Sequence, residues 1–420
     1  MSSRRVIYAM FAAGLVVVLV LTFIPYSLLT RARQAVVSVI SPPDVSSRAV
    51  EQPQGVTPPA LDVERWYAEH DERPELHGVL VETADRRALL ADHNADKTFN
   101  PASLIKLATT LLVLKRLGPD HRFETRVYTE GETDEATKTL KGRVFVSSAD
   151  PTFGDHAASL VARGLRERGV ERLDGEIVVT DGFSFNYNEK PEESAPLAAK
   201  VMGMKEKGTA VGEAPAGAPL FVLRSYTLRE ILLYMNAHSS NFVAEQLCAR
   251  VGGPEGLRNF IVGELGLSAE QVEIARCSGR ERNRMSARGV LAVLRALDDE
   301  AARHGMRLED LMPVASDDAG TLRRRLEGGP LDGALVGKTG TLTAEVDGGM
   351  ASLAGVVYTE RAGKIYFAIL DQGSRISENR ELEDLLLAQL ILAQDIPRPL
   401  PQTEERRRLL PSTSLTVSDE

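Results

Sequence analysis

Three short polar motifs constrain the fold of this chain most strongly, because they are far apart in the sequence and each lies in a defined predicted element. An S-x-x-K motif at residues 103–106 begins the first long predicted helix. An S-x-N motif at 239–241 lies at a corner between two predicted helices, and a K-T-G-T sequence at 338–341 is predicted on a strand. If these groups act together, the fold must bring all three segments to one cleft.

The first motif can make a serine nucleophilic. Ser103 and Lys106 are three residues apart, so they share one helical face and the lysine amine can reach the serine hydroxyl. A desolvated lysine that is neutral at working pH can accept the hydroxyl proton. Backbone N–H groups at the helix start can stabilise developing negative charge. Alone, however, the motif is common, and a helix cap beside a surface lysine explains it as well.

The other two motifs could relay a proton and hold a substrate. The hydroxyl of Ser239 could pass a proton between the lysine and a leaving group, and the amide of Asn241 could hold a peptide group. Alone, this S-x-N is an ordinary polar turn and N-cap. In the third motif, the cation of Lys338 and the hydroxyls of Thr339 and Thr341 could bind an anionic carboxylate. Gly340 has no side chain, so the backbone of a substrate could approach it closely.

Strand and helix patterns alternate along the middle of the chain, which predicts an α/β (α+β) fold. We expect residues 119–222 to form an inserted α/β subdomain, with 186–219 as a loop, and residues 63–118 and 223–395 to form the catalytic domain. Strands are predicted at 78–82, 88–91, 123–129, 142–146, 176–180, 350–358 and 364–371. Helices are predicted at 101–117, 157–168, 227–235, 243–251 and 379–392, the last with Asn379 as its N-cap.

The two ends of the chain differ from its middle. Residues 6–30 carry no charge and are long enough for a membrane span of about 20 residues. Because no A-x-A cleavage pattern follows, we expect an uncleaved transmembrane anchor, with residues 1–5 in the cytoplasm and the catalytic domain outside the membrane. Residues 31–62 are expected to be a proline-rich linker, and 396–420 a disordered tail.

Composition narrows the classes of function. A hydrophobic fraction of 43% with 26% charged residues is typical of a globular protein. A net charge of -9 and 5% aromatic residues argue against a nucleic-acid partner. The seven histidines show no metal-ligand spacing, so we expect no metal and no cofactor. Cys248 and Cys277 could pair if the domain is exported, or remain two separate buried thiols.

In this order the three motifs match the set of penicillin-binding proteins and class A β-lactamases. From about Leu76 to Gln394 the chain resembles the class C low-molecular-mass penicillin-binding proteins, the D-alanyl-D-alanine carboxypeptidase/endopeptidase family. The resemblance implies a transpeptidase/β-lactamase-like fold with an inserted subdomain. The segments that carry it are NPASLIKLATT, GRVFVSSADPTFG, RLDGEIVVTDGFSF, HSSNFVAEQL, RCSGRERNRMS and GKTGTLTAEVDGGMASLAGVV.

The resemblance also implies an activity and residue roles. The chain would be a serine DD-peptidase that acts through an acyl-enzyme on peptidoglycan stem peptides ending in D-Ala-D-Ala, outside the cytoplasmic membrane, with β-lactams as inhibitors. Backbone N–H groups of Ser103 and Thr341 would form the oxyanion hole. The catalytic residues would be the nucleophile Ser103, the base Lys106 and the relay Ser239. The substrate-binding residues would be Asn241, Lys338, Thr339, Gly340, Thr341 and Asp150.

Departures from the family pattern leave alternatives open. Ser147 and Ala149 replace usual glycines, and Arg276-Cys277 replaces a usual Asp-Gly. A β-lactamase would share the acylation residues, although no segment supplies the glutamate that activates its deacylating water. A wall-binding protein with weak turnover is a second alternative. Asp150 would grip an amine on the substrate side chain, or would cap the loop before Pro151.

Overall fold

The computed structural model describes residues 61–401, 410 and 414–419. The predicted membrane span at 6–30 and nearly all of the predicted linker lie outside the described residues. Among the helices that are described, none combines the length and the apolar character needed to cross a bilayer.

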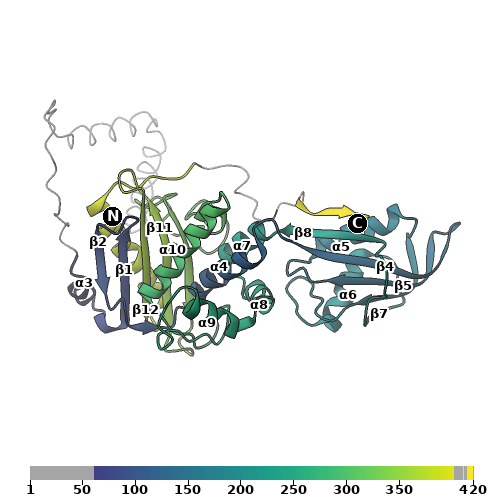
Figure 1. Cartoon of the computed structure of the whole chain (residues 1–420), viewed down its shortest axis with the longest axis horizontal. Coiled ribbons are helices and arrows are strands. Elements are labelled where there is room, and N and C mark those ends of the chain that lie inside the picture. The colour runs from purple at the N-terminus through teal and green to yellow at the C-terminus, as the bar shows by residue number, and fades with distance from the viewer. Residues whose placement is uncertain (1–60, 402–409, 411–413, 420) are drawn as a thin grey trace, which may run out of the picture. The chain divides into compact units, whose positions relative to one another are not determined.

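A five-stranded antiparallel sheet forms the centre of the catalytic part (Figure 1). Its strand order is β10 (Leu335–Leu342), β11 (Met350–Tyr358), β12 (Lys364–Gln372), β1 (His77–Thr83) and β2 (Leu89–His93). The strands predicted at 350–358 and 364–371 are confirmed as β11 and β12, which pair antiparallel along their whole length. All nine residues of β11 are buried, as expected for a strand covered on both faces.

Helices cover both faces of this sheet. On one face, α3 (Val63–Glu69) and α11 (Ile376–Gln394) pack Trp66, Leu386 and Leu390 against the strands. The other core contains α4 (Ile105–Leu117) and α10 (Ala287–Arg303). The expected N-cap at Asn379 is wrong, since α11 begins three residues earlier and Asn379 is buried within its first turns.

Two short polar corners precede the helices that carry the first two motifs. A 3₁₀ turn, η2 (Ala102–Leu104), leads into α4, and Ala102 has a positive φ of 49°. Helix α7 (Leu228–Ala237) is followed by Ser239, with φ of 53°, and by α8 (Asn241–Ala249), whose N-cap Ser240 accepts a bond from the N–H of Val243. Left-handed backbone at a non-glycine residue costs about 1–3 kcal/mol and is concentrated at functional sites.

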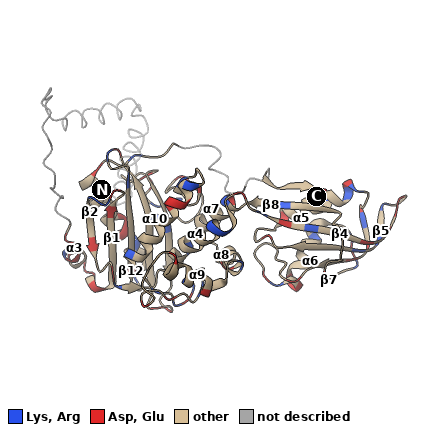
Figure 2. Ribbon diagram, viewed as in Figure 1, with Lys and Arg blue, Asp and Glu red and all other residues tan. Residues whose placement is uncertain are grey.

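The inserted part contains a six-stranded mixed sheet (Figure 1). Its order is β13 (Thr416–Ser418), β8 (Phe221–Thr227), β4 (Arg122–Asp134), β5 (Thr139–Ser148), β6 (Arg172–Val179) and β7 (Gly208–Val211). Helix α5 (Asp155–Glu167) connects β5 to the parallel strand β6. Lys and Arg are interspersed with Asp and Glu along the ribbon (Figure 2).

Three predicted boundaries in this part were wrong. The segment 186–219 is not a loop, because it contains α6 (Pro191–Met202) and β7. Ala195, Ala198, Ala199 and Met202 follow helical spacing and are buried, although the composition around them is polar. The insert ends at the end of β8, at Thr227 rather than 222, and residues 416–418 of the predicted disordered tail form β13 against β8.

The two cysteines, whose pairing the sequence left open, form a disulfide. Cys248 lies in α8 and Cys277 in the loop before β9 (Met285–Ser286), with Cα atoms 6.3 Å apart. The bond therefore ties the helix that begins with Asn241 to the loop that contains Ser278. Helix α9 (Gly253–Gly263) lies between the two cysteines in the chain.

Candidate active site

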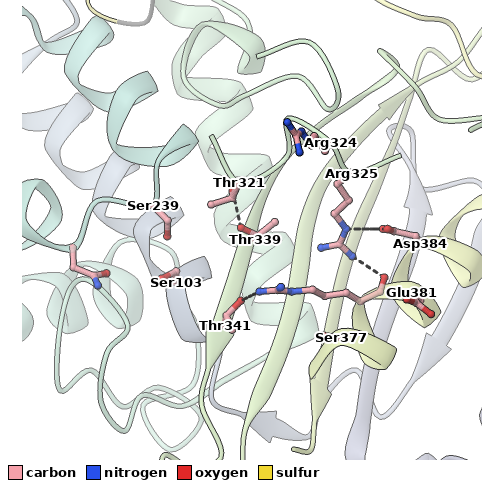
Figure 3. Close-up of a pocket in the computed structure, with 12 residues that line it drawn as sticks. Ser103, Ser239, Thr321, Arg324, Arg325, Thr339, Thr341, Ser377, Glu381 and Asp384 are labelled. Carbon is pink, nitrogen blue, oxygen red and sulfur yellow. Dashed lines mark hydrogen bonds and ion pairs between the residues drawn. The ribbon is translucent and has the colours of Figure 1, made fainter. Parts of the chain in front are cut away.

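The three motifs meet in one cleft of about 690 Å³ (Figure 3). Ser103, Ser239 and Asn241 approach it from the helical side, and the third motif contributes from strand β10. The opposite wall comes from the loop after Asp318 and from the first turns of α11. The lining residues are Ser103, Ser239, Asn241, Thr321, Arg324, Arg325, Thr339, Thr341, Ser377, Arg380, Glu381 and Asp384.

The amine of Lys106 has three oxygen atoms within hydrogen-bond distance. Its Nζ lies 3.0 Å from Ser103 Oγ, 2.7 Å from Asn241 Oδ1 and 2.5 Å from the carbonyl oxygen of Ser278. A neutral amine has two N–H donors and one lone pair. With Asn241 and Ser278 accepting the two donors, the lone pair is left for the hydroxyl of Ser103, as a general base requires.

Burial lowers the pKa of Lys106 to about 7, so a large fraction of the amine is neutral at neutral pH. The carboxylate of Glu245 raises this pKa, and the guanidinium of Arg280 lowers it. The direction of this shift agrees with the desolvated lysine expected from the sequence. The cation whose charge lowers the pKa of Lys106 is Arg280.

Lys338 lies beneath the relay serine. It is fully buried, and its Nζ donates to Ser239 Oγ at 2.8 Å and to the carbonyl oxygen of Thr339 at 2.6 Å. Burial, together with the charge of Lys106, lowers its pKa well below the usual value. Its amine is therefore positioned to hold Ser239, and it does not line the cleft where a substrate carboxylate would bind.

Gly340 allows the K-T-G-T strand to pack closely against the start of the serine helix. A Cβ at this position would lie 2.2 Å from Ser352 Oγ and 3.0 Å from both the Cβ of Ala102 and the carbonyl oxygen of Pro101. Strand β10 is an edge strand of its sheet, and its outer side is bonded to residues 313–315 at Leu335 to Gly337, while Thr339 and Thr341 further along the strand line the cleft. Gly340 thus brings this edge within reach of Ser103.

The side-chain hydroxyls of the two threonines in the motif each form one hydrogen bond. Thr339 Oγ1 donates to Thr321 Oγ1 at 2.8 Å. Thr341 Oγ1 accepts from Nη2 of Arg380, a residue of α11, at 2.6 Å. Both threonines line the cleft, so the hydroxyl pair expected from the sequence lies where a carboxylate could be bound.

Asp150 is placed differently from the other predicted residues. It is only 4% exposed and does not line the cleft. Its Oδ1 accepts from the N–H and the hydroxyl of Thr152 at 2.8 and 2.6 Å, which is the geometry of a loop cap. Burial raises the pKa of Asp150 to about 6, while the Thr152 bonds and the charge of Arg250 lower it.

Sequence reasoning missed four residues of this site. Ser278 supplies the carbonyl beside Lys106, Glu245 accepts from the N–H of Ser278 at 2.9 Å, and Thr321 and Arg380 bond to the motif threonines. Glu245 and Ser278 lie inside segments that carry the family resemblance, so only their roles were unknown. Nothing local to Arg380 signals its position, because α11 meets β10 only in the folded chain.

A buried lysine in contact with a serine, beside a second Lys-Ser pair and the K-T-G-T strand, is the arrangement expected of a serine acyl-enzyme peptidase of the penicillin-binding protein class. The family model of the D-Ala-D-Ala carboxypeptidase 3 (S13) family matches residues 62–194 and 198–390, which include all three motifs. The chain therefore belongs to the D-Ala-D-Ala carboxypeptidase 3 (S13) family and is a serine-type D-Ala-D-Ala carboxypeptidase in class.

Solved structures share the fold. The predatory peptidoglycan endopeptidase Bd3459 of Bdellovibrio bacteriovorus has a TM-score of 0.67 at 22% identity, covering 81% of this chain and 98% of its own. Its penicillin G-acylated form, in complex with immunity protein Bd3460, has a TM-score of 0.67 at 23% identity, covering 81% and 99%. Penicillin-binding protein 4 of Haemophilus influenzae has a TM-score of 0.63 at 18% identity, covering 79% and 99%.

Proposed function

We propose that this chain hydrolyses the D-Ala-D-Ala bond of peptidoglycan stem peptides with Ser103 as the acylated nucleophile, and that penicillin acylates the same hydroxyl. The observation that carries the proposal is the position of Lys106 Nζ, 3.0 Å from Ser103 Oγ, with Asn241 Oδ1 and the carbonyl oxygen of Ser278 as its other two partners. A neutral amine that donates to these two oxygens keeps its lone pair for the proton of Ser103.

The proposed reaction has two halves. Lys106 takes the proton of Ser103, whose Oγ attacks the carbonyl carbon of the penultimate D-Ala, and backbone N–H groups of Ser103 and Thr341 hold the resulting oxyanion. The proton then passes through Ser239 to the nitrogen of the leaving residue, and the C–N bond breaks. Water then attacks the ester carbonyl and gives up a proton to neutral Lys106, which passes the proton to Ser103 Oγ as the ester C–O bond breaks and the shortened peptide leaves with a carboxylate.

Substrate positioning falls to the remaining motif residues. The amide of Asn241 would hold a peptide group of the acyl portion, and the hydroxyls of Thr339 and Thr341 would receive the carboxylate of the leaving residue. Lys338 would maintain the orientation of Ser239 through the bond between them. The likeness to a peptidoglycan endopeptidase and to penicillin-binding protein 4 supports wall peptides as the substrate.

We further propose that residues 6–30 anchor the chain in the cytoplasmic membrane and that the catalytic part acts outside it. The uncharged apolar run and the proline-rich segment after it support this arrangement. The test is to fuse a reporter enzyme after Glu420 that is active only outside the cytoplasmic membrane. Activity of the reporter would show that the C-terminus lies outside. A C-terminus in the cytoplasm would contradict the wall-peptide proposal, since cross-linked peptidoglycan lies outside.

The activity itself is tested by incubating the full chain with a fluorescent penicillin and following the label with time. A stable adduct supports the DD-peptidase. Rapid loss of the label would indicate a β-lactamase, and the absence of any adduct would indicate a wall-binding protein without turnover. Release of free D-Ala from a peptide ending in D-Ala-D-Ala provides the matching measurement on substrate.

A further inference from the structure

A substrate that ends in a free carboxylate carries a permanent negative charge into the threonine end of the cleft. Burying an unpaired carboxylate is costly, so the site requires a dependable cation there. Lys338 is the obvious candidate from the sequence. In the structure, however, it is fully buried, does not line the cleft, and donates to Ser239 and to the Thr339 carbonyl.

Arg380 provides a cation at this position. Its Nη2 donates to Thr341 Oγ1 at 2.6 Å, and both residues line the cleft. Since Thr341 accepts this bond, its own hydroxyl proton remains free to donate to a substrate. A guanidinium stays charged at any working pH, and its flat fork of donors matches the two oxygens of a carboxylate.

The turn that carries Arg380 is held in place by a neighbouring buried arginine. Nη2 of Arg325 donates to the backbone carbonyl of Arg380 at 3.0 Å and to Glu383 Oε2 at 2.5 Å. Nε of Arg325 donates to both oxygens of Asp384, at 2.8 and 3.0 Å. These bonds hold the first turns of α11 against the loop that precedes β10. The backbone that carries the guanidinium of Arg380 is therefore held in place.

Three arginines line the cleft, and their surroundings differ. The guanidinium of Arg325 donates to the carboxylates of Glu383 and Asp384. Arg324 is exposed on the loop after Thr321. Among the residues that the structure describes, the arginine bonded to a hydroxyl of the K-T-G-T motif is Arg380.

We propose that Arg380 is the specificity-determining residue for a free C-terminal carboxylate: with Thr341 it binds the carboxylate of the leaving residue through charge-assisted hydrogen bonds. This inference rests on the proposed DD-peptidase function and adds a residue that none of the three motifs contains. Its consequence is a strong preference for substrates whose leaving residue has a free carboxylate over the same substrates with a terminal amide.

The test compares hydrolysis of a D-Ala-D-Ala peptide with that of its C-terminal amide, using the full chain. Arg380→Gln should lower kcat/KM for the acid about ten- to hundredfold, mainly through KM, and lower it much less for the amide, so that the preference collapses. Arg380→Lys should retain part of the preference. Arg323→Gln is the matched control, because it removes the same charge from an exposed position outside the cleft. This variant should retain the full preference for the acid over the amide.

Circular dichroism and denaturant unfolding of Arg380→Gln show whether the variant is folded. The inference is overturned if this variant keeps the wild-type preference, or if Arg324→Gln removes the preference instead. Failure of the wild-type chain to cleave either peptide and to bind penicillin would instead refute the proposed function itself.

Discussion

The backbone of Ser278 connects Glu245 to Lys106. Its N–H donates to Glu245 Oε1 at 2.9 Å, and its carbonyl oxygen lies 2.5 Å from Lys106 Nζ. Glu245 also acts directly on Lys106, because its negative charge raises the pKa of the buried amine. One carboxylate therefore both positions an acceptor of the general base and adjusts the pH at which that base is neutral.

This arrangement predicts the pH dependence of acylation. Lys106 has a pKa of about 7, and only its neutral form accepts a proton, so acylation should rise with pH through about 7 and then level off. Glu245→Gln keeps an acceptor for Ser278 but removes the charge that raises the pKa, so the rise should move to lower pH. Arg280→Gln removes a charge that lowers it, so the rise should move to higher pH.

The measurement is the second-order rate constant for penicillin acylation across the pH range. Opposite shifts in the two variants would confirm that the titrating group is Lys106. Shifts of the same sign, or none, would assign the pH dependence to another group.

A second prediction concerns the nucleophile and the base. Ser103→Ala should abolish penicillin labelling without loss of fold, because the lost hydroxyl makes few other contacts. Lys106→Arg should acylate about 10²–10⁴-fold more slowly, since a guanidinium stays protonated and cannot accept the serine proton. Labelling is followed by gel fluorescence and folding by circular dichroism. Persistent labelling of Ser103→Ala would identify another nucleophile.

The sequence predicted the parts of the site that short-range geometry determines. Ser103 and Lys106 are one helical turn apart, so their contact required only a helix, and Gly340 needed only a strand. The central hairpin followed from two apolar runs around a glycine turn. Each of these features depends on neighbours within a few residues.

The remaining features depend on contacts between distant segments. Arg380 reaches Thr341 because α11 packs near β10, and the Ser278 carbonyl reaches Lys106 because a remote loop folds over α4. Whether Cys248 and Cys277 pair depends on the same tertiary placement. Helix α6 was missed for a different reason, since its polar composition concealed a regular buried face.

A third prediction tests the close packing at Gly340. A Cβ there would lie 2.2 Å from Ser352 Oγ and 3.0 Å from Ala102 Cβ. Gly340→Ala should therefore cost about 1–3 kcal/mol of unfolding free energy and slow acylation, because β10 must move away from Ser103. Denaturant unfolding and penicillin kinetics measure the two effects. Adding Ser352→Ala should relieve part of both, and wild-type kinetics in the single variant would show that the strand does not need this approach.

A fourth prediction concerns the disulfide. Cys248 and Cys277 are separated by 29 residues, and a bond across a loop of this length typically contributes about 2–4 kcal/mol to stability. The double variant Cys248→Ser/Cys277→Ser should lose this much unfolding free energy. It should also acylate more slowly, since Cys277 precedes the Ser278 carbonyl beside Lys106. A reducing agent should reproduce both effects in the wild-type chain and have none on the variant. Loss of stability with unchanged acylation would limit the bond to a structural role.

The fifth prediction separates two roles of Asp150, selection of an amine on the substrate side chain and capping of its own loop. Both bonds from Thr152 end on Oδ1, an atom that asparagine also provides. Asp150→Asn therefore removes the charge and preserves the cap, whereas Asp150→Ala removes both. If the carboxylate binds an amine, Asp150→Asn should slow hydrolysis of amine-bearing peptides about ten- to hundredfold and spare acylation by a simple penicillin.

The pH provides an independent check on the same residue. Because the pKa of Asp150 is raised to about 6, the carboxylate loses its charge as the pH falls through 6, and selectivity for the amine should disappear there in the wild-type chain. Burial of the charged form opposes folding above that pH, so Asp150→Asn should be at least as stable as the wild type at pH 8. If Asp150→Asn instead matches the wild type on every peptide, while Asp150→Ala loses about 1 kcal/mol of stability, Asp150 is a loop cap and does not select the substrate.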